Sequence, residues 1–504
     1  MPSAHLTLDP HFTVGVVDRR VFGGFVEHLG RCVYDGIYEP GHPTADADGF
    51  REDVLALVRE LGVSTIRYPG GNFVSGFRWE DSVGPKEKRP VRADLAWHSI
   101  ETNQVGIDEF GRWLDKAGSD LMYAVNLGTR GVLEALDVLE YTNVRGGTTL
   151  SDARIANGRT EPYGVKMWCL GNEMDGPWQL GHRSAEDYGK IASQTAKAMR
   201  QLDPSVELVV CGSSSAQMPT FGAWEHTVLE HSYDDVDFIS CHAYYEELGG
   251  DTGSFLASAV NMDHFIESVV ATADAVGAAL KSTKKINISF DEWNVWYISR
   301  YHEVDRITDI EEWPVAPRLL EDSYSVLDAV VVGNLLISLL KHADRVTSAS
   351  LAQLVNVIAP IMTEPGGDTW RQTTFFPFAI TSRLATGSAL ELKLDSDSYE
   401  TAQYGTVPTV DAVATHDAEA GTTAIFLVNR SIDAPTTVTI DVSGLGDVRI
   451  AETHLLADDD IYAKNTLDHQ DRVGTTENST AVVTGGTLTV TLPAVSWTAI
   501  SLVA

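Results

Sequence analysis

The sequence has few cysteines, few basic residues and no long apolar segment. Its four cysteines form no CxxC pair and no metal-ligand spacing, which argues against a disulfide framework or a zinc site. Lys and Arg number 37 against 71 Asp and Glu, and the resulting net charge of −34 disfavours nucleic acid and anionic membrane surfaces as partners. The first residues, MPSAHLTLDPHF, lack the basic and apolar regions of a signal peptide. These absences predict a cytoplasmic protein that needs no metal and no cofactor.

Short β-prone runs alternate with helical patterns over most of the 504 residues. Residues 53–61, for example, place apolar side chains at positions i, i+3, i+4 and i+7, which predicts one buried helix face. The predicted strands are residues 22–27, 65–68, 121–126, 166–170, 208–211, 238–242, 286–290 and 348–353. Eight strand–helix alternations favour a closed (β/α)8 TIM barrel over an open sheet, and we assign residues 19–384 to it.

The pattern changes after about residue 385. Residues 436–442 and 487–492 alternate polar and β-branched or leucine side chains at period two, which is typical of an all-β sandwich. We therefore predict a jelly-roll-like β-sandwich domain over residues 385–504. Residues 1–18 also have a strand-like pattern, and we expect them to join this sandwich, although the pattern alone fits either domain.

Polar side chains stand where the predicted barrel strands end. In TIM-barrel enzymes the active site is built at the C-terminal ends of the strands. The residues at these positions are Glu27, Arg67, Asn72, Asn126, Asn172, Glu173, His242, Tyr244, Glu292 and Gln353. This set lacks the cluster of His and Cys that a zinc site needs.

Two carboxylates in this set fit glycosidic bond cleavage. Glu173 ends the segment KMWCLGNE, and Glu292 ends INISFDE. Glycosidases need one acid to protonate the leaving oxygen and one carboxylate to meet the developing positive charge; a separation of about 5–5.5 Å indicates a retaining mechanism. Either glutamate alone would fit a solvated surface position, but both together at strand ends predict a glycosidase site.

Five segments resemble the α-L-arabinofuranosidases of glycoside hydrolase family 51. They are GGFVEHLGRCVYDGIYEPGHP (23–43), IRYPGGNF (66–73), LAWHSIETNQVGIDEF (95–110), WCLGNEMDGPWQLGH (168–182) and FDEWNVWY (290–297). An Asn-Glu pair alone is shared with many barrel glycosidases, whereas these segments in this order are specific. The resemblance covers the whole barrel.

The resemblance implies a role for each matched residue. Glu173 resembles the general acid/base and Glu292 the nucleophile, while Asn172 resembles the residue that holds the sugar 2-hydroxyl. Tyr244 is expected to hydrogen-bond the nucleophile, and Arg67 to help keep it ionised. The other expected substrate-binding residues are Glu27, Asn72, Trp97, His242, Trp296 and Gln353.

Blander interpretations of some residues stay open on the sequence alone. Asn72 follows two glycines and could simply cap a turn, and His242 could be a core histidine. Trp97, Trp178 and Trp296 could stack on sugars or pack the barrel rim. Residues 301–322 are expected to form a long acidic loop, either a rim that contacts the leaving group or a solvated loop.

The implied activity is that of an exo-acting, retaining α-L-arabinofuranosidase. It would remove terminal α-L-arabinofuranosyl residues from arabinan- and arabinoxylan-derived oligosaccharides, and the family implies a homo-oligomer, a hexamer. One alternative is another retaining barrel glycosidase, an endo-β-glucanase or a β-xylosidase, but an endo-enzyme needs an open cleft. A non-catalytic carbohydrate-binding protein would be expected to lack one of the two carboxylates. A metal-dependent hydrolase gains little support from the histidine spacing.

Overall fold

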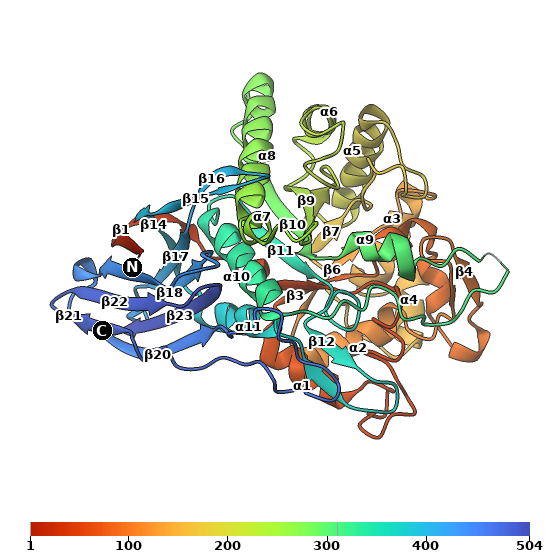
Figure 1. Ribbon diagram of the computed structural model, residues 1–504. Helices are drawn as coiled ribbons and strands as arrows, with labels where there is room; N and C mark the ends of the chain where they lie inside the picture. Colours follow the sequence, from red (N-terminus) through yellow and green to blue (C-terminus); the bar gives the residue numbers. More distant parts are fainter. Residues whose placement is uncertain (1, 310) are drawn as a thin grey trace.

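The computed structural model describes residues 2–309 and 311–504. Within them eight parallel strands close a barrel (Figure 1) in the order β10-β11-β2-β3-β6-β7-β8-β9. The strands are β2 Gly23–Phe25, β3 Thr65–Tyr68, β6 Asp120–Ala124, β7 Met167–Cys169, β8 Glu207–Val210, β9 Phe238–Tyr245, β10 Asn287–Val295 and β11 Val346–Ala352. Each corresponds to one of the predicted runs, so the predicted barrel is confirmed.

A helix follows each barrel strand. These helices are α1 Glu52–Leu61, α2 Ile107–Ala117, α3 Val132–Asn143, α5 Ala185–Leu202, α6 Ala223–Ser232, α8 Ser258–Leu280, α10 Val326–Lys341 and α11 Phe375–Leu384. The local signals explain their bounds. The Ser184 side chain caps α5 by accepting a hydrogen bond from the backbone N–H of Asp187. Gly62 ends α1 in the left-handed conformation that glycine adopts without strain.

Short elements lie in the connections between the main strands and helices. The hairpin of β4 Arg92–Asp94 and β5 Ser99–Glu101 carries Trp97 in its turn. The others are α4 Thr149–Ala156, α7 Thr252–Leu256, α9 Ile298–Arg300, and the strand pairs β12 Ile361–Thr363 with β13 Thr369–Arg371 and β15 Ser398–Thr401 with β16 Gly405–Pro408. None of the described helices is long and apolar enough to cross a lipid bilayer.

The rest of the chain forms a nine-stranded sheet beside the barrel, and both chain ends lie in this part of the molecule (Figure 1). Its strands, in spatial order, are β20 Arg449–Leu456, β23 Ser496–Val503, β18 Thr422–Asn429, β17 Val410–Asp417, β14 Ser388–Ser396, β1 Ser3–Val16, β19 Thr436–Asp441, β22 Thr487–Leu492 and β21 Val482–Thr484. Strand β1 lies between β14 (antiparallel) and β19 (parallel), so the beginning of the chain completes this sheet.

Period-two alternation gives the sheet two apolar faces. Ala414 and Ile425 lie in one buried cluster together with Leu6 and Ile440 of the far strands, so the sheet curls over its own core. The next residues along β17 and β18, such as Phe426, turn to the opposite face and join the barrel core. Helix α10 packs against that face and is buried all round, which explains why its sequence is apolar on every side.

Candidate active site

The predicted site residues converge on a cavity at the C-terminal ends of the barrel strands. Its inner part is lined by Phe25, Glu27, Leu29, Gly71, Asn72, Trp97, Glu173, Tyr244, Glu292, Trp296, Leu320, Gln353 and Ile358. Arg67, Asn172 and His242 lie directly behind this lining and hydrogen-bond to its polar members. The cavity therefore combines several apolar side chains with a few converging polar groups, as small-ligand sites do.

Glu292 is held at the floor of the cavity by two donors. Arg67 Nη1 lies 2.7 Å from one carboxylate oxygen, and the Tyr244 hydroxyl donates to the other at 2.7 Å. Arg67 Nη2 donates to Asn172 Oδ1 at 2.6 Å, so one guanidinium orients both side chains. Burial raises the pKa of Glu292, while the positive charges of His242 and Arg67 oppose that rise.

Glu173 faces Glu292 across the cavity and accepts two hydrogen bonds. Its donors are Trp178 Nε1, at 2.6 Å, and His242 Nδ1, at 2.9 Å. The residue has a φ of 42°, a left-handed conformation that costs about 1–3 kcal/mol and is found preferentially at functional sites. One oxygen of Glu173 and one of Glu292 lie within 4.8 Å of each other. That separation is closer to the spacing of retaining glycosidases than to the about 6.5–9.5 Å of inverting ones.

His242 bridges Glu173 to a buried carboxylate that the sequence analysis did not select, Asp291. Its Nε2 lies 2.9 Å from Asp291 Oδ1. Burial lowers the pKa of His242, but the charges and hydrogen bonds of Glu292, Asp291 and Glu173 outweigh burial and raise it to about 10. His242 Nδ1 and oxygens of both glutamates also lie within 4.8 Å of one another, a spacing that a cation could use. In the described residues both ring nitrogens of His242 already contact carboxylates.

Asp291 was missed because strict alternation would point it away from Glu292. The register of β10 against both neighbouring strands shifts between residues 289 and 293. Such an irregularity re-aims side chains, and it lets consecutive carboxylates both approach Arg67. No signal in the sequence marks this shift.

Glu27 organises another part of the cavity wall. Its Oε1 accepts hydrogen bonds from Phe73 N, at 2.8 Å, and Trp97 Nε1, at 2.9 Å, while Gln353 Nε2 approaches its Oε2 at 3.3 Å. Burial raises the pKa of Glu27 to about 8. A Cβ atom on Gly71 would lie 2.3 Å from the same carboxylate, so a side chain there would push Glu27 out of this arrangement.

The strand-end pattern placed Asn126 among the candidate site residues and left the role of Trp178 open. Asn126 lies outside the cavity lining and bonds to the backbone of Phe77, Gly128 and Thr129, which makes it a turn-stabilising residue. Trp178 is about half exposed, lines the outer cavity and donates to Glu173. Its indole therefore belongs to the site.

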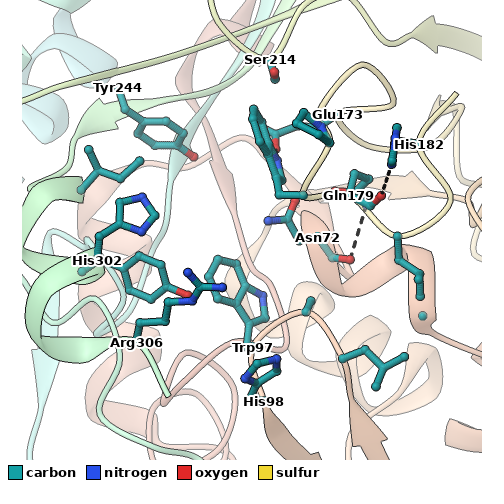
Figure 2. A pocket seen from close by; sticks show the side chains of 18 of the residues that line it. Asn72, Trp97, His98, Glu173, Gln179, His182, Ser214, Tyr244, His302 and Arg306 are labelled. Atoms are coloured by element: carbon teal, nitrogen blue, oxygen red, sulfur yellow. Dashed lines mark hydrogen bonds between the residues drawn. The ribbon is translucent and has the colours of Figure 1, made fainter. Parts of the chain in front are cut away.

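An outer cavity of about 810 Å³ continues from the inner one and shares Asn72, Trp97, Glu173, Tyr244 and Trp296 with it. Figure 2 shows His302 and Arg306 on one side of this cavity and Glu173 and His182 on the other. The predicted loop 301–322, apart from residue 310, which lies outside the described residues, supplies His302, Arg306 and Ile307 to the lining. The backbone of this loop bonds to the β4–β5 hairpin through Ile100 N and Pro314 O, at 2.9 Å. Part of the loop thus forms a rim of the cavity.

Two family models match the chain. The α-L-arabinofuranosidase 1 domain matches residues 57–249, and the α-L-arabinofuranosidase C-terminal domain matches residues 291–496. Together these matches include Glu173 and Glu292.

Relatives of known activity are similar over nearly the whole chain. An exo-α-(1→6)-L-arabinofuranosidase from Bifidobacterium longum is 60% identical over 99% of this chain and 97% of its own. An intracellular exo-α-(1→5)-L-arabinofuranosidase from Streptomyces lividans is 58% identical over 99% of this chain and 75% of its own. A solved family 51 α-L-arabinofuranosidase from Bifidobacterium longum superposes with a TM-score of 0.96 at 52% identity, covering 99% of both chains. On these findings and the site geometry, the chain belongs to the α-L-arabinofuranosidases of glycoside hydrolase family 51.

Proposed function

We propose that this chain is an exo-acting, retaining α-L-arabinofuranosidase in which Glu173 is the general acid/base and Glu292 the nucleophile. The observation that carries the proposal is the pair of buried carboxylates with oxygens within 4.8 Å of each other at the floor of the cavity. A gap of this size places the nucleophile against the anomeric carbon and leaves no room for an intervening water.

In the first step a carboxylate oxygen of Glu292 bonds to the anomeric carbon of the arabinofuranosyl residue. The glycosidic bond breaks as Glu173 transfers its proton to the leaving oxygen. In the second step Glu173 removes a proton from water, the water oxygen bonds to the same carbon, and Glu292 is released. Arg67 and Tyr244 keep Glu292 aimed at the sugar through their hydrogen bonds. Asn172 turns its amide toward the sugar 2-hydroxyl, because its Oδ1 is fixed by Arg67.

The inner cavity holds the terminal arabinofuranosyl residue. Glu27, Asn72 and Gln353 bind its hydroxyls, and a sugar of different shape would leave these buried groups unpaired. Trp97 and Trp296 pack against the ring. The names of the two relatives described above share the arabinofuranosyl residue but differ in linkage, (1→6) against (1→5). This supports recognition of the terminal sugar in the inner cavity and of the linkage outside it.

The location, substrates and oligomeric state that we propose follow from membership of the family. We place the enzyme inside the cell, acting on arabinofuranosyl oligosaccharides as a homohexamer. Residues 1–18 and 385–504 form the sheet domain, and residues 19–384 form the catalytic barrel.

The test is release of 4-nitrophenol from 4-nitrophenyl α-L-arabinofuranoside by the wild type and by Glu292→Ala. We expect a loss of at least about 10³-fold, which is several kcal/mol of transition-state stabilisation. Azide should rescue the variant and give the β-configured arabinofuranosyl azide, because azide enters from the face that Glu292 occupied. Glu303→Ala, at an exposed carboxylate outside the cavity, is the control.

Other outcomes would redirect the assignment. Full activity of Glu292→Ala would refute the two-carboxylate mechanism. A wild type that is inactive here but cleaves an aryl β-glycoside would be a different retaining glycosidase. We also expect dialysis against a chelator to leave the rate unchanged, because both nitrogens of His242 are already engaged by carboxylates.

A further inference from the structure

The lining of the outer cavity lacks the acidic excess of the whole molecule. The whole chain has 71 acidic and 37 basic residues. Among the described residues that line the outer cavity, the only carboxylate is that of Glu173, whereas the basic side chains are His98, His182, His302 and Arg306. The part of the cavity that receives the leaving group therefore has one carboxylate, that of Glu173, which it shares with the inner cavity.

Arg306 is the fully charged member of this group and has no neutralising partner. It is exposed, and in the described part of the chain no carboxylate lies within 4.0 Å of its guanidinium, nor does this group make a hydrogen bond. Its acidic neighbour Asp305 pairs instead with Arg300, which also faces Asp322, at 3.5 and 3.6 Å. The guanidinium of Arg306 is thus available to a ligand in the cavity.

Two histidines of the lining, His98 and His182, are held with one ring nitrogen uncommitted. His98 stacks on Trp313, with ring centroids 5.0 Å apart, and its Nδ1 donates to the carbonyl oxygen of Ile307 at 2.7 Å. His182 Nδ1 similarly faces the carbonyl oxygen of Gln179, at 3.2 Å. These contacts occupy Nδ1 and leave Nε2 of each ring for a further partner. The rim is consequently ordered around polar groups that suit an oxygen-rich ligand.

We propose that the preferred leaving group of this enzyme is a saccharide bearing a carboxylate, such as a uronic acid, which pairs with Arg306. The proposal rests on the proposed arabinofuranosidase function and specifies the substrate class at the same site. A neutral sugar would form only ordinary hydrogen bonds with a guanidinium, whereas a carboxylate forms paired, charge-assisted ones. The guanidinium of Arg306 also offsets, within the cavity, the repulsion that a net charge of −34 exerts on an anionic substrate.

The experiment compares an anionic and a neutral aryl substrate, and the ratio between enzyme variants cancels their difference in intrinsic reactivity. They are 3-carboxyphenyl α-L-arabinofuranoside and its neutral methyl ester, hydrolysed by wild type, Arg306→Gln and Arg306→Lys. We expect Arg306→Gln to lower kcat/KM on the acid about tenfold more than on the ester, chiefly through KM, and Arg306→Lys to retain most of the preference. Salt should weaken the preference of the wild type, because the pair is exposed.

Arg318→Gln is the matched control, since it removes a charge from the same loop but not from the cavity lining, and its carboxylate partners are Glu321 and Glu364. It should leave the acid-to-ester ratio unchanged. Equal losses on both substrates in Arg306→Gln, or no loss on either, would overturn the inference. Failure of the wild type to cleave even the neutral ester would instead refute the proposed arabinofuranosidase function.

Discussion

At the scale of single residues, the raised pKa of Glu27 predicts that its protonated form supports activity. Burial raises its pKa to about 8, so the carboxyl group is protonated at pH 6 and becomes ionised as the pH rises through about 8. Glu27→Gln resembles the neutral acid and should retain kcat/KM within about tenfold at pH 6. Glu27→Ala should lose about 10²-fold or more, because it leaves Trp97 Nε1 and Phe73 N without their acceptor.

The pH profile separates the two protonation states of Glu27. In the wild type, ionisation above about pH 8 adds a negative charge close to Glu292, so kcat/KM should fall there. Glu27→Gln cannot ionise and should lack this contribution to the fall. The measurement is kcat/KM from pH 5 to 10 for both proteins on the same aryl arabinofuranoside. Equal damage by Gln and Ala at pH 6 would mean that Glu27 works as a carboxylate.

The same residues show what a sequence can predict about a site. Glu173, Glu292 and Gln353 were found because polar residues at the ends of apolar strands must meet at one mouth of a barrel. Asp291 escaped because the register shift in β10 is a property of strand pairing and not of local residue preference. The sequence could not show whether Trp178 contacts the catalytic residues or only packs at the rim, because the difference is a hydrogen bond from its indole to Glu173.

At the scale of elements, alternation and helix periodicity predict where strands and helices lie in the sequence. They do not predict which elements pair with one another. The period-two pattern of β19 Thr436–Asp441 and β22 Thr487–Leu492 predicts half-buried strands. The position of β1 between β14 and β19 depends on pairing across more than 370 residues, which no local pattern encodes. The contact of the 301–322 loop with the β4–β5 hairpin is non-local in the same way.

Helix α10 is tied to the sheet by a buried charge cluster that should carry much of the contact between the two parts. Asp411 of β17 lies 2.5 Å from Lys341 Nζ and 2.7 Å from Arg430 Nη2, and Asn334 of α10 donates to it at 2.8 Å. Asp411→Ala would leave the buried Arg430 without its carboxylate and Lys341 with only the more distant Asp263. We expect a loss of about 3–5 kcal/mol in the free energy of unfolding, seen as a lower midpoint in calorimetry.

An exposed pair in a similar place provides the control. Arg383 of α11 and Glu452 of β20 also join a barrel helix to the sheet, at 2.8 Å, but both side chains are at least one-third exposed. Glu452→Ala should therefore cost at most about 1 kcal/mol in the free energy of unfolding.

The lysine and arginine hold the pKa of Asp411 far below its usual range, despite burial. Its contribution is thus present above about pH 4 and is lost only as the pH falls toward the folded-state pKa. Equal losses in the free energy of unfolding for Asp411→Ala and Glu452→Ala would contradict this ranking of the buried and the exposed charge groups.

At the scale of the whole molecule, the closed barrel explains how the catalytic side chains are held in fixed relative positions. Arg67, Asn172 and Glu292 come from three separate βα units, yet two hydrogen bonds of one guanidinium fix their relative positions. This precision depends on barrel closure, in which β11 pairs with β2 across more than 300 residues. Closure was predictable from the number of alternations, whereas the distances within the site depend on packing that only the folded chain defines.

The net charge of each chain bears on the proposed hexamer. Chains of charge −34 repel one another, and the repulsion reaches about 30 Å at 0.01 M salt but only about 10 Å at 0.1 M. Sedimentation equilibrium in 0.2 M salt should therefore give about six times the 54.8 kDa of one chain, whereas dilution into 0.01 M salt should lower the mass. A neutral osmolyte at matched osmolality controls for effects other than screening. A mass of one chain at high salt would refute the hexamer. A hexamer of unchanged mass at low salt would show that apolar contacts at its interfaces outweigh the repulsion.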